Sequence, residues 1–343
     1  MREHIHLVNT HGIGDVIMSL PVIESVLSSG FKLSMLVKSN VEAEVIKTVL
    51  NLSEDKVEFI YFQNLSKEGV KGYLKILKKL RSLNIDLIIP SHSVNINKYN
   101  LIALFSKSKV RAGQSGGKFN FNHINYDDQS QGHKVEVNYA IFDFILSEAG
   151  YNFKPCINLT IPSYHKTNPY RFIDKYERGV ISIAPGSGVV ESHKRWPIEK
   201  YAELIELLLR DKFTIAILGG PGEEELAESI MRLVDHSTGI YNFTGKLKIK
   251  ETMDVLYESD FLVSNCNGIS HMASAIEQIK IIGIYGPTNF KITGAYSDNF
   301  FPQSLNLKCS PCYNSSYVTG CGNPICMLNI NAQDIHNAIR EVQ

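Results

Sequence analysis

The sequence predicts an α/β protein with two Rossmann-like domains that face each other across a cleft. In both halves of the 343-residue chain, short apolar runs alternate with segments of helical spacing. Continuous apolar strands separated by helices are typical of a parallel sheet that is covered on both faces. A chain of this length also favours two domains over one. We expect strands at 4–9, 33–37, 57–62 and 85–89 in the first half, and at 180–184, 213–218, 239–243, 261–264 and 281–285 in the second.

The segment between the two halves is typical of a linker, because it is polar and carries prolines at positions 162 and 169. We therefore expect an N-terminal domain over residues 1–165 and a C-terminal domain over residues 170–332. The last stretch, 333–343, is expected to form a helix that packs back on the N-terminal domain.

Composition excludes several classes of protein. Lys and Arg together number 35, as do Asp and Glu, so the formal net charge is zero. A neutral chain lacks the broad basic surface that nucleic-acid binding requires. No apolar run is long enough to span a membrane, and the N-terminus turns polar too early for a secretory signal. We expect a cytoplasmic protein that binds no nucleic acid.

The segment APGSGVVESHKRWP, residues 184–197, predicts a phosphate site. It lies between an apolar run and a segment of helical spacing. Glycines such as Gly186 and Gly188 let backbone N–H groups approach an anion closely, and Lys194 or Arg195 can add positive charge. The pattern indicates that the chain handles a nucleotide.

The first predicted strand ends in THGIGDV, where Gly12 and Gly14 allow a tight turn and Asp15 falls at the start of a helix. Two interpretations of Asp15 stay open. The side chain caps the helix, or it is a general base whose carboxylate the helix N-terminus keeps ionised. Nearby in the same half, the polar segment 112–134 is expected to be a long mobile loop, and such loops often bind ligands.

Two more turns follow strands of the second half. In GGPGEEE (219–225), Gly220 lets a base or ribose approach the backbone, and Glu223 or Glu224 could accept both ribose hydroxyls. Alternatively, these carboxylates only complement the helix dipole. In SNCNGISHMASA (264–275), the predicted helix start offers unpaired N–H groups to an anion, and His271 in its first turn either packs inside the protein or donates to a phosphate or leaving-group oxygen. The place of His271 at the same sheet edge favours the second role.

Seven segments, taken in order, carry a family resemblance: GIGDVIMSLPVIESV (12–26), APGSG with KRWP (184–197), LGGPGEEELAE (218–228), NFTGK (242–246), SNCNGISHMASA (264–275), YGPTNFKITGAY (285–296) and CSPCY with CMLNI (309–330). With this ordered set the chain resembles glycosyltransferase family 9, the group that includes lipopolysaccharide heptosyltransferases. The resemblance implies a GT-B fold and inverting, metal-independent sugar transfer. The donor would be a nucleotide-sugar, most often ADP-heptose, and the acceptor a glycan or lipid-linked hydroxyl.

The resemblance also implies roles for single residues. Asp15 would be the general base, with Ser187 and Lys194 on the phosphates and Glu223 or Glu224 on the ribose. The expected donor set is Gly186, Ser187, Gly188, Lys194, Gly220, Glu223, Glu224, Asn267, Gly268 and His271. The expected acceptor set is Gly12, Gly14 and His133.

The chain departs from the family pattern at Cys266. The family usually carries Asp before a Ser/Thr-Gly pair, where this chain has Cys266-Asn267-Gly268. That carboxylate would be expected to contact the donor sugar, and a thiol accepts such hydrogen bonds poorly. Asn265 or Asn267 could substitute for it. The identity of the donor sugar therefore stays open.

Four cysteines gather near the C-terminus, and they predict a structural metal site. The spacing of Cys309, Cys312, Cys321 and Cys326 is compatible with a loop that holds tetrahedral Zn²⁺, or else iron. Four thiolates leave no open coordination position, so we expect such a metal to be structural rather than catalytic. Alternatively, the four residues are reduced thiols in a loop.

Residues 67–83, KEGVKGYLKILKKLRSL, predict an amphipathic helix with a basic outer face. We expect Val70, Leu74, Leu77 and Leu80 to point inward. Such a helix is most often simply solvated. It could also dock on the anionic inner membrane, where a lipid-linked acceptor would be found.

Two other functions stay open beside the transferase. One is a non-catalytic nucleotide-sugar-binding protein whose Cys-rich segment, 309–326, recruits a partner; the other is a transferase that acts on a protein acceptor. A nicotinamide oxidoreductase is less favoured, because the first turn lacks the third glycine of the dinucleotide-binding pattern.

Overall fold

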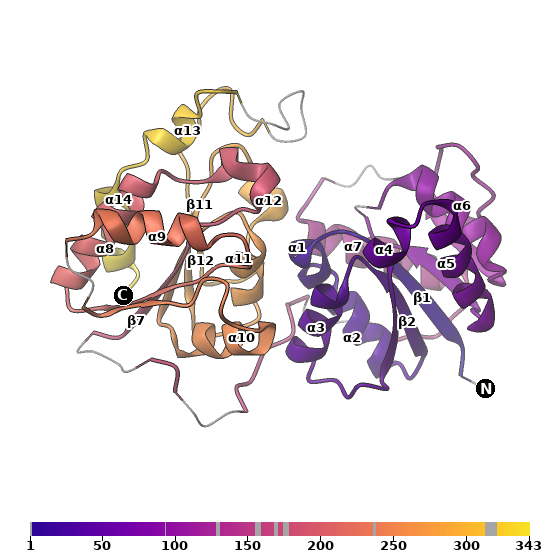
Figure 1. The fold of residues 1–343 in the computed structure, drawn as a ribbon. Helices are drawn as coiled ribbons and strands as arrows, with labels where there is room; N and C mark the ends of the chain where they lie inside the picture. Colours follow the sequence, from indigo (N-terminus) through magenta and orange to yellow (C-terminus); the bar gives the residue numbers. More distant parts are fainter. Residues whose placement is uncertain are drawn as a thin grey trace. The chain divides into compact units, whose positions relative to one another are not determined.

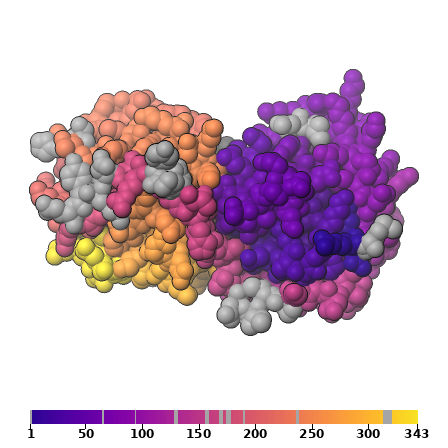
Figure 2. Space-filling view, turned by 90° about the horizontal axis from the view of Figure 1, so that it is seen from below, coloured from indigo at the N-terminus to yellow at the C-terminus, as the bar shows by residue number. Residues whose placement is uncertain are grey.

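The computed structural model describes residues 2–92, 94–127, 131–154, 159–167, 171–173, 178–235, 238–312 and 321–343. The chain divides into two compact units, residues 1–162 and 163–343. Figures 1 and 2 distinguish the two units by colour, from indigo through magenta for the first and from magenta through yellow for the second.

The first unit alternates strands and helices. Its elements are β1 (His4–Asn9), α1 (Ile13–Ile17), α2 (Leu20–Ser28), β2 (Lys32–Val37), α3 (Asn40–Val49), β3 (Val57–Tyr61), α4 (Phe62–Ser66), α5 (Val70–Ser82), β4 (Leu87–Pro90), α6 (Ile96–Ser106), β5 (Val110–Gln114), β6 (Ile124–Tyr126) and α7 (Lys134–Glu148). Every residue of β1 and β4 is buried, as expected for strands of a parallel sheet that is covered on both faces.

The second unit repeats the alternation. Its elements are β7 (Val180–Ala184), the 3₁₀ helix η1 (Val189–Lys194), α8 (Ile198–Arg210), β8 (Thr214–Ile217), α9 (Glu224–Leu233), β9 (Ile240–Asn242), α10 (Ile249–Glu258), β10 (Phe261–Asn265), α11 (Gly268–Ala273), β11 (Lys280–Ile284), α12 (Phe290–Thr293), β12 (Phe300–Gln303), α13 (Ile325–Leu328) and α14 (Ala332–Glu341). Figure 1 shows the helices of this unit on both sides of its strands.

Within the described residues, each unit holds one six-stranded sheet in which all the pairs are parallel. The strand orders are β3-β2-β1-β4-β5-β6 and β12-β11-β10-β7-β8-β9. Both follow the doubly wound pattern, in which the chain reverses direction across the sheet between the first and fourth strands. Ligands of such sheets bind beyond the carboxyl ends of the strands at that reversal. The sites to examine are therefore the loops after β1 and β4, and those after β7 and β10.

The C-terminal helix belongs to the second unit. α14 packs against α8, and its buried Ile335 and Ile339 belong to the apolar core of this unit. The ring of His336 adds a hydrogen bond of 2.9 Å to the Asp211 carboxylate just beyond α8. The apolar face of α14 is thus buried against α8 and the core of its own unit, and the expected contact with the N-terminal domain stays a prediction.

Two expectations about the first unit were wrong. Residues 112–134 are not one long loop, because β6 lies within them and pairs with β5; residues 128–130 lie outside the described part of the chain. In α5, the residues buried on the inner face are Gly72, Ile76 and Leu80. Val70 and Leu74, expected inward, are 75% and 60% exposed.

None of the described helices combines the length and apolarity needed to cross a membrane.

A chain of buried hydrogen bonds joins β1 to β2 at the end of the sheet opposite Asp15. His4 Nδ1 lies 2.8 Å from the Leu83 carbonyl, and His4 Nε2 lies 2.8 Å from Ser34 Oγ. His6 Nδ1 lies 2.7 Å from the same hydroxyl. A carbonyl only accepts, so His4 donates through Nδ1, Ser34 donates to His4, and His6 donates to Ser34. This arrangement requires both rings to be neutral, and His6 Nε2 has no partner among the described residues.

Acid should therefore destabilise the first unit. Burial lowers the pKa of His6 from 6.5 to about 3 and lowers that of His4 as well. Because the unfolded chain binds the protons first, stability is complete above about pH 6.5 and falls as the pH drops from there toward 3. The slope approaches about 1.4 kcal/mol per pH unit for each ring. The unfolding midpoint in urea, followed by far-UV circular dichroism, should decrease between pH 7 and pH 5.

The controls use the chain's single tryptophan, Trp196, which lies in the second unit. Its fluorescence reports that unit, so the fluorescence midpoint should change less with pH than the first unit's transition. His6→Leu should weaken the acid sensitivity, whereas the exposed His165→Leu should retain it. Equal acid sensitivity in the wild type and in His6→Leu would contradict this account.

Candidate functional site

Asp15 lies in the short helix α1, directly after β1 and at the carboxyl edge of the first sheet. The N-cap of α1 is Gly12 rather than Asp15, so the capping interpretation does not hold at that position. Asp15 Oδ1 accepts a bond of 3.2 Å from Lys134 Nζ, and the two side chains are 24% and 23% exposed. The carboxylate is therefore paired with a cation yet still reachable from solvent.

Hydrogen bonds from Asn9 and Ser19 fix the backbone around Asp15. The buried Asn9, the last residue of β1, donates from Nδ2 to the Asp15 carbonyl at 3.3 Å and to Ser19 Oγ at 3.2 Å. Ser19 Oγ donates to the same Asp15 carbonyl at 2.9 Å. Asn9 Oδ1 accepts the His11 backbone N–H at 3.4 Å. These bonds hold the turn that carries Asp15 on the end of a buried strand, as a catalytic side chain requires.

His133 and Gly12, which were expected on the acceptor side, have different surroundings. His133 is the N-cap of α7: its Nδ1 accepts the Val135 N–H at 3.2 Å, and its own N–H donates to Glu136 at 3.2 Å. This cap sets the position of Lys134, the first residue of the helix. Gly12 has an ordinary negative φ, and an added Cβ would meet nothing within 4 Å. Nothing in the surrounding protein therefore requires glycine at position 12, and its backbone faces open space.

The glycine turn after β7 is tied to its neighbours on the β10 side. Asn265 donates to the Pro185 carbonyl at 2.6 Å and accepts from the Trp196 N–H and the Tyr201 hydroxyl. Asn267 donates to the carbonyls of Ala184 and Gly186 at 3.1 and 2.9 Å. Its Oδ1 also accepts the Ser270 N–H and so caps α11. Both amides thus hydrogen-bond within the protein, and whether either substitutes for the family's carboxylate stays a prediction.

Glu223, the N-cap of α9, holds the same glycine turn after β7 by hydrogen bonds. Its Oε1 accepts the Gly188 N–H at 3.1 Å, and its Oε2 accepts the Gly220 N–H at 3.0 Å. A Cβ on Gly186 would meet this carboxylate, so a larger residue at position 186 would displace Glu223 from these bonds. Glu223 thus joins two glycine turns. Glu224 accepts the Gly222 N–H at 2.7 Å beside Gly245.

The cations of the predicted phosphate segment lie close to the turn. Lys194 is 7% exposed, and its Nζ donates to Glu191 at 2.7 Å. Arg195 donates from Nε to Ser187 Oγ at 3.2 Å and from Nη2 to the Gly188 carbonyl at 2.9 Å. The structure therefore brings Ser187, Lys194 and Arg195 together at the carboxyl end of β7. A compact cationic group on a glycine turn can neutralise a phosphate.

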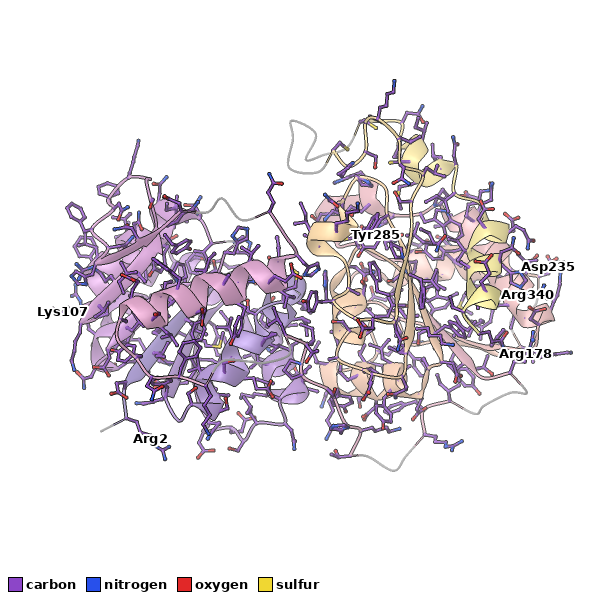
Figure 3. All side chains as sticks on the ribbon, turned by 180° about the vertical axis from the view of Figure 1, so that it is seen from behind. Arg2, Lys107, Arg178, Asp235, Tyr285 and Arg340 are labelled. Carbon is purple, nitrogen blue, oxygen red and sulfur yellow. The ribbon has the colours of Figure 1, made fainter. Side chains whose placement is uncertain are left out.

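Gly268 and His271 begin α11 at the neighbouring strand end. His271 is buried, at 5% exposure, and Cys266 is 9% exposed. Cys266 and Ser270 lie beside the hydroxyl of Tyr285, the buried residue that follows β11 and is labelled in Figure 3. Burial raises the pKa of Tyr285 well above its usual range, and the neighbouring Cys266 thiol raises it further. The Tyr285 hydroxyl is itself buried, so Cys266 and Ser270 pack against a neutral phenol inside the unit.

The described residues do not support the metal site predicted on the four C-terminal cysteines. Among the described residues, no group of three or more His, Cys, Asp or Glu side chains could hold a metal ion. Cys309 and Cys321 are exposed, whereas Cys326 is buried in the apolar core and packs against Gly286. Burial and the nearby thiols raise the pKa of Cys312 and Cys326. The structure thus gives no support to Zn²⁺ or iron here.

Comparison with known proteins identifies the family. The model of glycosyltransferase family 9 (heptosyltransferase) matches residues 73–321, well over half of the chain. The chain belongs to this family. The resemblance inferred from the ordered motifs is therefore confirmed.

Two relatives illustrate the range of similarity within glycosyltransferase family 9. Lipooligosaccharide heptosyltransferase 2 of Haemophilus influenzae is 31% identical over 124 residues, which cover 36% of this chain and 35% of that protein. Lipopolysaccharide core heptosyltransferase OpsX of the same species is 23% identical over 243 residues, 68% of this chain and 66% of that protein. The chain thus spans about a third of the length of the first of these relatives.

Solved structures confirm the fold. The Escherichia coli ADP-heptose lps heptosyltransferase II matches with a TM-score of 0.73 at 18% identity, over 100% of both chains. The Escherichia coli heptosyltransferase WaaC with ADP matches with a TM-score of 0.73 at 20% identity, over 98% of this chain and 99% of that one. The predicted α/β, GT-B class with two Rossmann-like units is therefore right.

Sequence reasoning missed Lys134, Asn9 and Tyr285. One feature of the sequence could have pointed to Lys134, since it stands at the end of the polar segment 112–134, where a helix begins. Asn9 could have been found as an amide that ends an otherwise apolar strand. Tyr285 resembles a core aromatic in the sequence, and only the fold brings its hydroxyl to Cys266.

Proposed function

We propose that this protein is an inverting glycosyltransferase that transfers heptose from ADP-heptose to a hydroxyl of a lipopolysaccharide-core-type glycan, without a metal ion in the reaction. Family membership and the names of the relatives support the sugar and the acceptor. The observation that carries the chemistry is the Asp15 carboxylate, paired with Lys134 and open to solvent at the end of β1.

The first unit would supply the general base. Asp15 takes the proton of the acceptor hydroxyl as the oxygen attacks the anomeric carbon from the face opposite the nucleotide, which inverts that centre. The Lys134 ammonium stabilises the ionised carboxylate before the reaction. The Asn9 and Ser19 bonds to the Asp15 carbonyl orient the turn.

The second unit would hold the nucleotide-sugar. Lys194 and Arg195 neutralise the diphosphate as the glycosidic bond breaks, and this positive charge does the work that a divalent cation does in other transferases. Glu223 keeps the two glycine turns in place, so we assign the ribose to Glu224, whose carboxylate is held by one described backbone bond.

The proposal is tested by ligand screening followed by transfer. ADP-heptose should raise the thermal midpoint of the full chain more than GDP-, UDP- or dTDP-sugars do, and transfer to a lipopolysaccharide-core acceptor should persist in EDTA. Stabilisation only by non-adenine nucleotides would refute the ADP-heptose assignment. Binding without transfer to any glycan would instead favour a nucleotide-sugar-binding protein.

Removing the Lys134 charge should move the pH dependence of transfer. In Lys134→Met the carboxylate of Asp15 loses its cation, so a higher pH is needed to ionise it. A partly exposed pair contributes up to about 1 kcal/mol, which corresponds to a shift of up to about 0.7 pH unit in the acid limb of the kcat profile. The exposed Lys154→Met, in the same unit, should leave the profile unchanged. An acid limb that does not move in Lys134→Met would remove Lys134 from this role.

A further inference from the structure

The outer side of α5 and α6 exposes large apolar side chains. Val70 and Leu74 on α5 are 75% and 60% exposed, and Leu101 and Phe105 on α6 are 37% and 46% exposed. The two helices pack side by side (Figure 1). We call these four residues and the side chains between them the α5–α6 surface. Single exposed apolar residues are ordinary, but a contiguous group marks an interaction site.

A groove runs through this surface. Its volume is about 430 Å³, and it is lined by Leu74, Leu77, Lys78, Arg81 and Phe105. Arg81 Nε donates to the Phe105 carbonyl at 2.8 Å and so fixes one helix against the other. The groove therefore has an apolar floor and a cationic edge held by the fold.

Cations outnumber anions around the surface. α5 carries Lys71, Lys75, Lys78, Lys79 and Arg81, all exposed, and Lys107, labelled in Figure 3, ends α6. Lys75 pairs with Glu68 at 2.6 Å, and Lys79 lies 3.9 Å from Glu58. Two carboxylates thus face six cations, although the whole chain has no net charge. This excess gathers on the helices that expose the apolar residues.

We propose that the α5–α6 surface docks the protein on an anionic phospholipid bilayer. An apolar strip with a lysine-rich border is the pattern of helices that lie in the membrane interface. Val70, Leu74 and Phe105 enter the boundary between headgroups and acyl chains, while the lysines extend to the phosphates. A second copy of the chain fits less well, because a twofold contact would place the same six cations against each other. The proposal concerns a partner of the protein and does not depend on which sugar is transferred.

The test is co-sedimentation of the full chain with vesicles of phosphatidylcholine alone or with 30% phosphatidylglycerol. Wild type should bind the anionic vesicles, bind neutral vesicles at least tenfold less, and be released by 0.5 M salt. The Leu74→Ser/Phe105→Ser variant should lose at least tenfold in binding. The matched control is Leu233→Ser on α9 of the second unit, where Leu233 is 47% exposed, and it should bind as wild type does.

Thermal melts of both variants establish that each is folded before its binding is compared. Absence of wild-type binding to anionic vesicles would overturn the proposal, and so would binding that Leu74→Ser/Phe105→Ser leaves unchanged. Analytical ultracentrifugation of the same proteins adds a separate outcome. A wild-type dimer that this variant dissociates, without any vesicle binding, would assign the surface to a second copy of the chain instead.

Discussion

Asp15→Asn is expected to lower the turnover of sugar transfer by about 10²–10⁴-fold, the range that a positioned general base contributes. The amide has nearly the shape of the carboxylate, and its Oδ1 can still accept a hydrogen bond from Lys134. It cannot accept the proton of an attacking hydroxyl. The effect should therefore fall on kcat, measured with saturating donor and acceptor.

A measurement of nucleotide binding distinguishes the loss of the general base in Asp15→Asn from misfolding of the variant. Asp15 lies in the first unit, whereas the predicted phosphate residues lie in the second, so the Kd of ADP should be unchanged in Asp15→Asn. Asp143→Asn, an exposed carboxylate on α7 of the same unit, should transfer at the wild-type rate. Wild-type turnover in Asp15→Asn would exclude the residue as the base, and a loss of ADP binding would point to a structural role.

Lys194→Met is expected to have the second-largest effect, about 10²–10³-fold on kcat/KM, because it removes the buried cation that meets developing phosphate charge and leaves only Arg195 beside the turn. Methionine retains the apolar length of the side chain, so the variant removes chiefly the charge. Lys194 is already held at 2.7 Å by Glu191, and its position therefore does not depend on the ligand.

Calorimetric titration with ADP and with adenosine checks this account of Lys194. The affinity for ADP should fall much more than that for adenosine, since only ADP carries the phosphates. Lys200→Met, six residues further along and half-buried on α8, serves as the matched control and should bind both ligands as wild type does. Equal losses for ADP and adenosine would mean that the substitution disturbs the turn rather than the charge.

The sequence predicted long, apolar elements better than short or polar ones. The strands β1, β7, β10 and β11 are rich in buried apolar residues, and this pattern can be recognised without a structure. The short strands β5, β6 and β12 were not predicted, because VRAGQ, INY and FFPQ lack a continuous apolar run. In α5, helical spacing alone could not show which side meets the sheet.

The candidate site was predicted at the level of its loops but not of its contacts. Strand ends are local features, so the turns around Gly12, Gly188 and Gly268 were found in the sequence. Hydrogen bonds between distant segments were not. Asn267 and Glu223, for example, bond to the protein's own backbone across 81 and 35 positions, while their predicted contact with the donor stays a prediction. Lys134 reaches Asp15 across 119 positions, a pairing that only the tertiary fold creates.

The hydrogen bonds that hold the turn after β7 also affect the affinity for the nucleotide. Asn265, Asn267 and Glu223 immobilise residues 184–188 when the chain folds. A nucleotide that binds to this turn does not have to order a mobile loop. The conformational entropy of the turn is already lost when the chain folds, before the nucleotide binds. More of the contact energy is then left over as net binding free energy, and loosening any one tie should accelerate dissociation of the nucleotide more than it slows association.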